Sequence, residues 1–308
     1  MSQKGVVIKS TGKWSDVRAE DGELYVCQIK GKFRLQGIKT TNPLAVGDKV
    51  TFALEDDGTG VIEEIEERKN YVIRKSVNLS KQAHIVASNL DQAFLVVTME
   101  NPPTSTGFID RFLVTAEAYG IPTIIVFNKI DEYTQDAHEE MAYYQYIYEA
   151  CGYETMEISA LKGDGVNEVA KRMECKVNMV SGHSGVGKST LINQLIPDAN
   201  IRTAETSAYH SKGRHTTTFA EMHELPNSGM IIDTPGIKGF GLIDIPKEEL
   251  NHHFPEMFSL LPDCKFHNCL HINEPGCAVR AAIENEEIPE ERYVNYLSMY
   301  EEEEGPYR

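Results

Sequence analysis

The sequence contains no apolar run that approaches the ~20 residues needed for a membrane-spanning helix, and no signal-peptide pattern opens it. It also contains no coiled-coil heptad repeat that would demand a dimer. The first absence excludes the class of helical membrane-spanning proteins. Together these absences predict a cytoplasmic monomer, in which the six cysteines stay reduced and available to a metal.

Positive charge is also scarce, because 30 Lys and Arg residues stand against 47 Asp and Glu residues, and the net charge is −17. A surface that binds nucleic acid normally needs positive charge to meet the phosphates. The N-terminal region is more favourable for nucleic-acid binding than the net charge suggests. Residues 1–50 carry nine Lys or Arg against five Asp or Glu, a local net charge of +4. The segment Lys30–Arg34 places Phe33 inside a basic run, which suits either an RNA-facing strand or ordinary solvated lysines on a barrel.

A phosphate-binding loop of the form G-x-x-x-x-G-K-S follows a strand-like run and precedes a helix-like run, which is the context that this motif requires. Its glycines allow backbone N–H groups to turn toward phosphate oxygens, and the helix N-terminus adds partial positive charge. Lys188 is predicted to reach the β- and γ-phosphates and Ser189 to ligate magnesium, so an ordinary Gly-rich turn is the weaker interpretation. The predicted nucleotide-binding residues of this region are Gly182, His183, Ser184, Gly185, Val186, Gly187, Lys188, Ser189 and Thr190.

Two features downstream complete the predicted magnesium and γ-phosphate site. An apolar strand runs into a D-x-x-G motif, in which Asp233 would hold magnesium through water and the Gly236 N–H would sense the γ-phosphate. A Thr triplet lies between the two motifs. A Thr triplet alone is more often an ordinary loop, but this position favours a second magnesium hydroxyl, with Thr217 preferred and Thr218 second.

Base selectivity is predicted from a pair of motifs that lies earlier in the chain. The N-K-x-D motif, with Asn128, Lys129 and Asp131, ends a continuous apolar run of the kind that a buried parallel strand needs. Asp131 can accept hydrogen bonds from the guanine ring N–H and the exocyclic amine, which adenine does not offer. Asn128 and Lys129 would orient the loop and cover the base. Another strand ends in an S-A-x motif at Ser159 and Ala160, where a backbone N–H would contact the guanine carbonyl.

Four cysteine and histidine side chains near the C-terminus follow the pattern C-x4-C-x-H-x5-C. Three thiolates and one imidazole form a closed tetrahedral set suited to one structural zinc ion, and scattered thiols are the less favoured interpretation. Because the protein fills every position, no place remains for a catalytic water, which argues against a metal-dependent hydrolase. The predicted zinc ligands are Cys264, Cys269, His271 and Cys277. The remaining cysteines are expected to be buried small residues, and they are Cys27, Cys151 and Cys175.

The guanine motif precedes the phosphate loop, whereas ordinary small GTPases carry the phosphate loop first, so the order indicates a circularly permuted GTPase. With the Gly-Arg-His-Thr-Thr-Thr loop at 213–218 and the Cys/His cluster, the chain resembles the ribosome small-subunit-dependent GTPases, the RsgA or YjeQ family, over nearly its whole length. The resemblance implies a multidomain fold with an N-terminal OB-fold β-barrel, a central α/β P-loop GTPase with circularly permuted motif order, and a C-terminal mainly α zinc-binding domain. It also implies binding to the small (30S) ribosomal subunit and its rRNA, hydrolysis of GTP to GDP and phosphate when stimulated by it, and a role in late 30S maturation.

The pattern of expected strands and helices along the chain supports this organisation. Short extended segments separated by turns fill the first part and are typical of a small β-barrel. Strands then alternate with helical segments, including a helix near 109–118, which indicates a parallel sheet with ligands at the strand C-termini. We expect an OB-fold RNA-binding domain at 1–68, a GTPase domain at 69–245 and a zinc-binding helical domain at 246–308, with the acidic run 301–304 as a disordered tail.

The residue that orients the attacking water is missing from its usual position. Ras-like enzymes carry Gln after D-x-x-G, whereas an aliphatic Ile237 stands here, so we expect slow intrinsic hydrolysis and activation by a partner. Some family members place a His shortly after D-x-x-G, whereas this chain offers Asp244 in the aligned stretch. His215 is therefore the substitute candidate for the catalytic histidine, and Lys188 and Thr217 are the other predicted catalytic residues. The missing residue keeps open a second interpretation, a nucleotide-gated RNA-binding scaffold with incidental hydrolysis.

Overall fold

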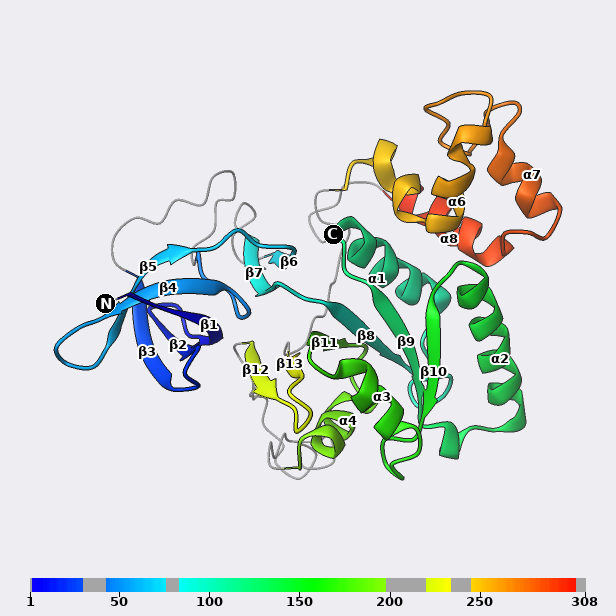
Figure 1. The fold of residues 1–308 in the computed structure, drawn as a ribbon. Coiled ribbons are helices and arrows are strands. Elements are labelled where there is room, and N and C mark those ends of the chain that lie inside the picture. Colours follow the sequence, from blue (N-terminus) through cyan, green and yellow to red (C-terminus); the bar gives the residue numbers. More distant parts are fainter. Residues whose placement is uncertain (1, 30–42, 76–82, 198–219, 234–244, 303–308) are drawn as a thin grey trace. The chain divides into compact units, whose positions relative to one another are not determined.

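The computed structural model describes residues 2–29, 43–75, 83–197, 220–233 and 245–302. Figure 1 draws the described residues in colour and the others as a grey trace. The chain forms two compact units, and each is built from segments that are separated in the sequence. None of the helices in the described ranges combines the length and the apolarity that a membrane crossing needs. Unit 1 comprises Met1–Ala93, Val166–Ser181 and Gly187–Lys238, and unit 2 comprises Phe94–Gly165, Gly182–Val186 and Gly239–Arg308.

Five strands of unit 1 form a β-barrel: β1 (Ser2–Ser10), β2 (Trp14–Ala19), β3 (Leu24–Ile29), β4 (Lys49–Leu54) and β5 (Gly60–Ile65). They pair in the order β1-β2-β3-β5-β4, and β4 pairs back with β1, which closes the barrel. Side chains alternate along β2, so that Val17 points inward to pack with Phe52 and Ile62. The predicted N-terminal β-barrel is therefore confirmed.

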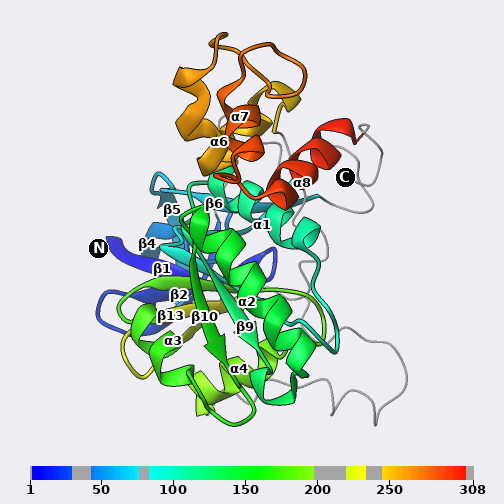
Figure 2. The ribbon, with the colours of Figure 1, turned by 90° about the vertical axis from the view of Figure 1, so that its right-hand side faces the viewer.

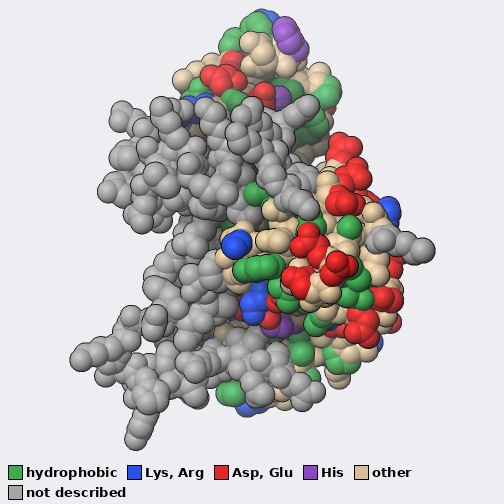
Figure 3. All heavy atoms as spheres, turned by 90° about the vertical axis from the view of Figure 1, so that its left-hand side faces the viewer, with side chains coloured by type: hydrophobic (Ala, Val, Ile, Leu, Met, Phe, Trp, Pro, Cys, Tyr) green, Lys and Arg blue, Asp and Glu red, His purple; other side chains and the backbone are tan. Residues whose placement is uncertain are grey.

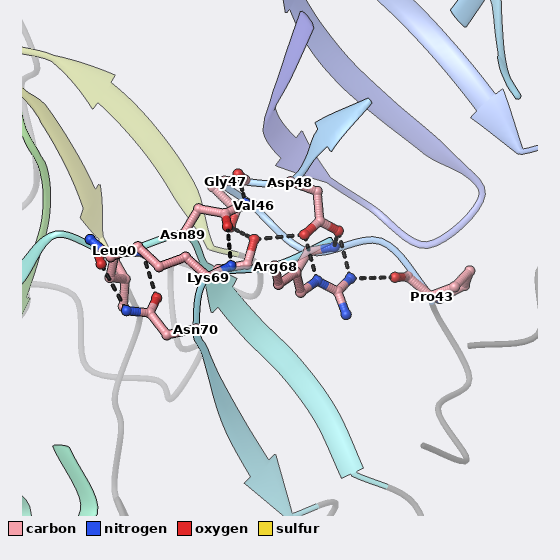
Figure 4. Close-up of polar contacts among 11 residues, drawn as sticks. Pro43, Val46, Gly47, Asp48, Arg68, Lys69, Asn70, Asn89 and Leu90 are labelled. Atoms are coloured by element: carbon pink, nitrogen blue, oxygen red, sulfur yellow. Dashed lines mark hydrogen bonds and ion pairs between the residues drawn. The ribbon is translucent and has the colours of Figure 1, made fainter. Parts of the chain in front are cut away.

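A buried polar network fastens the barrel to the chain that follows it (Figure 4). The Asp48 carboxylate is fully buried, and it accepts hydrogen bonds of 2.6 Å from both Nε and Nη2 of Arg68 and one of 2.7 Å from Ser88 Oγ. Gly47 has φ 96°, and a Cβ there would collide with the Ser88 carbonyl oxygen, so only glycine allows this close approach. Hydrogen bonds and an ion pair thus hold the loop before β4 against the linker at Arg68.

The remaining elements of unit 1 follow the barrel in the sequence, and they are β6 (Tyr71–Lys75), β7 (Ala83–Ser88), α3 (Val166–Met173), β11 (Val177–Ser181), α4 (Lys188–Leu195), β12 (Glu221–Glu224) and β13 (Met230–Asp233). Strands β6 and β7 form an antiparallel pair. Strand β13 pairs in parallel with β11 and antiparallel with β12, which in turn meets β1 of the barrel. Ion pairs Lys9–Glu221 (3.1 Å) and Arg18–Glu224 (2.5 Å) join the barrel to β12.

Unit 2 contains the strands and helices that surround the guanine motif. Its strand order is β10-β9-β8, in which β10 pairs in parallel with β9 and every residue of β8 and β9 is buried. This pattern is typical of a parallel sheet that is covered on both faces. Helix α2 lies alongside β10 (Figure 2). The elements are β8 (Gln92–Val97, which begins in unit 1), α1 (Thr106–Ala118), β9 (Thr123–Asn128), the 3-10 helix η1 (Ile130–Glu132), α2 (Gln135–Ala150) and β10 (Glu154–Ile158).

The C-terminal part of unit 2 is mainly helical, as predicted. Its apolar core includes Phe254, Met257 and Tyr296, and it also contains Val114, so this region packs against α1. Helix α1 begins at Thr106 rather than at the predicted residue 109, because the Ser105 side chain accepts a hydrogen bond from the Phe108 N–H and caps the helix one turn earlier. The elements are η3 (Lys247–His253), α6 (Pro255–Leu260), η4 (Leu261–Asp263), α7 (Ala278–Glu284) and α8 (Glu290–Glu301).

The structure differs from two expectations, one about a cysteine and one about the acidic run at 301–304. Cys27 and Cys151 are buried as predicted, but Cys175 is exposed, in a turn where its φ is 54°. The acidic run at the C-terminus is not entirely a free tail. Glu301 ends α8, and Glu302 accepts hydrogen bonds from the Arg111 guanidinium, one of them at 3.1 Å, because the last helix brings its carboxylate beside α1.

Candidate functional site

The phosphate loop follows β11 and leads into α4, as the motif predicts. Gly182, Gly185 and Gly187 have φ values of 141°, 92° and 93°, a region that L side chains rarely adopt. A Cβ on Gly182 would also collide with the Val96 carbonyl oxygen. The turn therefore requires glycine at these positions, as does a loop that directs backbone N–H groups toward a phosphate.

Lys188 and Asp233 carry the charge of this site in unit 1. Burial lowers the pKa of Lys188 to about 8, and Asp233 opposes the shift. Burial also raises the pKa of Asp233, against the attraction of His223 and Lys188. Lys188 is thus a largely desolvated cation at the start of α4, and the negative charge of a bound phosphate would favour its protonated form. Ser189 and Thr190 follow it in the first turn of α4 and are half-buried.

The Asn128 side chain joins three of the predicted nucleotide motifs within unit 2. Its Nδ2 donates a hydrogen bond of 2.7 Å to the carbonyl oxygen of Val186 in the phosphate loop. Its Oδ1 accepts one of 2.9 Å from the N–H of Ala160 in the S-A-x motif. Asn128 is only 1% exposed, so both contacts are shielded from water. Motifs from three distant parts of the sequence are brought together here.

Asp131 lies in the short helix η1, and one of its carboxylate oxygens has no partner. Oδ1 is buried and makes no hydrogen bond with any described residue, while Oδ2 lies 3.9 Å from Lys162 Nζ. A buried acceptor without a donor is costly, and guanine offers the two N–H groups that would satisfy a carboxylate. Lys129 precedes it in the left-handed region, at φ 68°, and its Nζ donates to the Asn101 carbonyl oxygen at 2.6 Å. The chemistry of the site fits a guanine base.

The S-A-x motif forms a tight turn after β10. Ser159 is fully buried; its Oγ accepts a hydrogen bond of 3.1 Å from the Lys162 N–H, and its carbonyl oxygen accepts one of 2.8 Å from the Gly163 N–H. The Ala160 N–H is already bonded to Asn128. Both residues therefore shape the loop beside the guanine motif, and their direct contact with the base stays a prediction.

Two other residues of the phosphate loop have defined surroundings. The His183 ring stacks on Phe108 of α1, with centroids 3.5 Å apart and planes 29° apart. Val186 is fully buried. Ser184 and Gly185 are exposed. Phe108 was not found from the sequence, because no motif links the start of α1 to the loop.

Several predicted residues lie outside the described ranges. These are the basic segment Lys30–Arg34, the candidates His215, Thr217 and Thr218, Gly236 of the D-x-x-G motif, and the catalytic-position residues Ile237 and Asp244. Their roles stay predictions.

The predicted metal cluster is assembled in unit 2, and it is the group of metal-ligating type found among the described residues. The four ligand atoms lie within 4.8 Å of one another. His271 Nδ1 is 3.6 Å from Cys264 Sγ and 3.4 Å from Cys277 Sγ, close to the ~3.5 Å edge expected when Zn–N and Zn–S bonds have their usual lengths. The donor set and its spacing are compatible with a zinc site.

Backbone N–H groups point at two of the sulfur atoms of the cluster, and a neighbouring side chain orients the imidazole. Cys264 Sγ accepts a hydrogen bond of 3.4 Å from the Ala278 N–H, and Cys277 Sγ accepts one of 3.5 Å from the Arg280 N–H at the start of α7. The far nitrogen of His271, Nε2, lies 3.1 Å from the Asn251 side-chain amide, which orients the ring with Nδ1 toward the sulfur atoms.

Positive charge is sparse on one described face of the molecule. Acidic side chains are more prominent than basic ones on the face shown in Figure 3. The segment 30–42 contains Lys30, Lys32, Arg34 and Lys39 and no Asp or Glu, so much of the positive charge of the barrel region belongs to residues outside the described ranges.

Comparisons with known proteins cover both the barrel and the nucleotide motifs. The RsgA N-terminal domain family matches residues 4–62, and the RsgA GTPase family matches residues 65–243. The chain is 56% identical over 308 residues to a protein of Christiangramia forsetii, which covers 99% of the chain and 98% of that protein. It is 56% identical over 306 residues to a protein of Bacteroides fragilis, which covers 99% of each. Both relatives are named small ribosomal subunit biogenesis GTPase RsgA.

Two solved structures are similar along the whole chain. YjeQ from Thermotoga maritima is 35% identical with a TM-score of 0.79, covering 97% of this chain and 98% of that one. YloQ, described as a circularly permuted GTPase, is 30% identical with a TM-score of 0.76, covering 97% and 94%. These likenesses confirm the circularly permuted arrangement that the motif order predicted. Sequence and structure agree that the chain belongs to the RsgA GTPase family, whose members hydrolyse GTP.

Proposed function

We propose that this GTPase binds the small (30S) ribosomal subunit and its rRNA, hydrolyses GTP when stimulated by that subunit, and assists late 30S maturation as a cytoplasmic monomer. The names of the relatives support the ribosomal part of the proposal. The observation that supports the guanine site best is the Asn128 side chain, which joins the N-K-x-D, S-A-x and phosphate-loop motifs. The three regions 1–68, 69–245 and 246–308 would serve RNA contact, hydrolysis and zinc binding respectively.

The residues of the site would divide the work of binding the nucleotide. The Asp131 carboxylate accepts hydrogen bonds from guanine, while Asn128 and Lys129 hold and cover the base. The loop from Gly182 to Gly187 gives backbone N–H groups to the phosphates, and Lys188 places a positive charge against them. Bound magnesium supplies further neutralisation of the phosphate charge, and Ser189, Thr217 and Asp233 are the residues proposed to hold it.

The slow step of this scheme is orientation of the attacking water. The aliphatic Ile237 cannot accept a proton or a hydrogen bond from water, so unstimulated hydrolysis is expected to be slow. The subunit would complete the site, either by bringing its own groups to the water or by ordering a residue such as His215. Release of phosphate would then weaken the complex, and the protein would leave the subunit.

Cycling on the subunit tests this proposal. In co-sedimentation with isolated 30S subunits, the chain is expected to pellet with a non-hydrolysable GTP analogue and to remain largely in the supernatant with GDP. With GTP it is expected to bind and then to be released as phosphate forms. Lys188→Ala is expected to fail in GTP-driven release. Normal release of this variant would mean that hydrolysis does not drive the cycle.

The zinc proposal makes a separate prediction. Replacing one ligand with Cys277→Ser is expected to lower the zinc content from about one ion per chain to near zero, because structural sites need all four ligands. Mass spectrometry of total metal measures the content. Cys175→Ser is the matched control, since this cysteine is exposed and outside the cluster, and it is expected to retain zinc. Full zinc content in Cys277→Ser would refute the proposed ligand set.

The alternative is a nucleotide-gated RNA-binding scaffold, in which GTP or GDP sets the conformation and turnover is incidental. The absence of a water-orienting side chain after D-x-x-G favours it. The two functions differ in whether the subunit accelerates GTP hydrolysis.

A further inference from the structure

The segment between β8 and α1 contacts the guanine motif and the residues just after it at three points, although no nucleotide motif includes this segment. The Met99 N–H donates a hydrogen bond of 3.0 Å to the Tyr133 hydroxyl. The Asn101 carbonyl oxygen accepts one of 2.6 Å from Lys129 Nζ. The Glu100 carboxylate accepts from the Thr134 N–H at 3.1 Å and from the Thr134 hydroxyl at 2.9 Å. We call residues 99–101 the brace; all of these contacts lie within unit 2.

The Tyr133 hydroxyl oxygen contacts both the guanine motif and the brace. The hydroxyl accepts from the Met99 N–H and donates a hydrogen bond of 2.7 Å to the carbonyl oxygen of Asn128. Met99 is 3% exposed and Asn128 is 1% exposed, so water does not readily replace the hydroxyl. Burial raises the pKa of Tyr133 to about 12, so its proton is present at neutral pH and available to donate. Phenylalanine would leave both backbone groups without this partner.

The position of Tyr133 explains why this bridge bears on base recognition. Asp131 lies in η1, which spans only Ile130–Glu132, and Tyr133 ends that turn. On its other side the turn starts from Lys129 in a left-handed conformation that is uncommon for residues other than glycine. Both ends of the turn therefore contact the brace, and between them lies Asp131 Oδ1, which is buried and has no hydrogen-bond partner among the described residues.

We propose that Tyr133 is a positioning residue for guanine recognition, whose hydroxyl holds the N-K-x-D turn against the brace so that the Asp131 carboxylate meets the exocyclic amine and ring N–H of the base. The inference rests on the proposed guanine site and adds a residue outside its motifs. A small displacement of the turn weakens a hydrogen bond steeply, because hydrogen bonds depend on both distance and angle.

The test compares GDP with inosine diphosphate, which lacks the exocyclic amine but keeps every other contact. The ratio of their dissociation constants in the wild-type chain reports the bond between Asp131 and the amine. Tyr133→Phe is expected to reduce this ratio by about threefold to tenfold, the range that one hydrogen bond supplies. Turnover of GTP at saturation is expected to stay within about twofold of wild type while KM rises, because the phosphate residues are untouched.

Tyr146→Phe is the matched control, since Tyr146 is 61% exposed on α2, and it is expected to leave the ratio unchanged. If Tyr133→Phe lowers the melting temperature by several degrees, Glu100→Gln, which weakens the neighbouring tie to Thr134, must reduce the ratio in the same direction. An unchanged ratio in a folded Tyr133→Phe variant would overturn the inference. A wild-type chain that binds GDP and inosine diphosphate equally would instead overturn the guanine-site proposal on which the inference rests.

Discussion

Replacing Asp131 by asparagine is expected to weaken GTP binding by about a thousandfold, because two hydrogen bonds to a charged acceptor are lost or reversed. In the structure the Asp131 carboxylate has one buried oxygen with no partner among the described residues, and it is the acceptor that guanine would satisfy. A carboxamide presents one donor and one acceptor in place of two acceptors. This pattern matches xanthine, whose ring offers a carbonyl oxygen where guanine has its amine.

The same variant is therefore expected to gain affinity for xanthosine triphosphate while it loses GTP. Fluorescent analogues of both nucleotides measure the exchange directly. Asp136→Asn is the matched control, because Asp136 is exposed in the first turn of α2, and it is expected to change neither affinity. Retention of tight, selective GTP binding by Asp131→Asn would show that base recognition lies elsewhere.

Arg292→Ala is expected to lower the free energy of unfolding by about 3–5 kcal/mol, because it leaves buried carboxylates without their cation. Arg292 on α8 is fully buried, as is Asp110 on α1. Its Nη1 donates to Asp110 at 2.6 Å, and its Nε donates to Glu256 on α6 at 2.8 Å. Burial raises the pKa of Asp110, and Arg292 opposes that shift, so loss of the guanidinium favours protonation of this carboxyl. The guanidinium also lies 4.7 Å from the centre of the Phe254 ring.

Unfolding by urea, followed by circular dichroism, measures this effect. Arg280→Ala is the control, since Arg280 is exposed on α7, and it is expected to cost less than about 0.5 kcal/mol. A double variant with Asp110→Asn is expected to lose less than the sum of the two single losses, because both substitutions break the same cluster. A loss below about 1 kcal/mol in Arg292→Ala would show that this cluster does not hold the C-terminal helices on α1.

The nucleotide motifs were predictable from the sequence because their chemistry is local. Each is a short run with fixed spacing at the end of an apolar strand, and the order of N-K-x-D before the phosphate loop indicated the circular permutation. The zinc ligands were predictable for the same reason, since Cys264 and Cys277 belong to one short segment. In the structure the four predicted ligand atoms lie close together, as the sequence pattern predicts.

Contacts between distant residues were not predictable. Asp110 and Arg292 are 182 positions apart, and neither belongs to a motif. The Asp48–Arg68 pair, which joins the barrel to its linker, was not predictable either, because it depends on packing that a single sequence does not reveal. Tyr133 lies two residues after Asp131 and was nevertheless missed. Its role depends on the hydroxyl reaching Met99, and the only sequence signal was a tyrosine two residues after the guanine motif.

The partner dependence of hydrolysis is the central claim, and GTP turnover by the zinc-loaded protein with and without isolated 30S subunits tests it most directly, with ATP as the control nucleotide. Lys188, the loop glycines and Asp131 provide for binding GTP, while the position after D-x-x-G provides nothing to orient water. We predict stimulation by the subunit of at least about tenfold, with GTP only. Equal turnover with and without the subunit would contradict a subunit-activated GTPase and favour the scaffold.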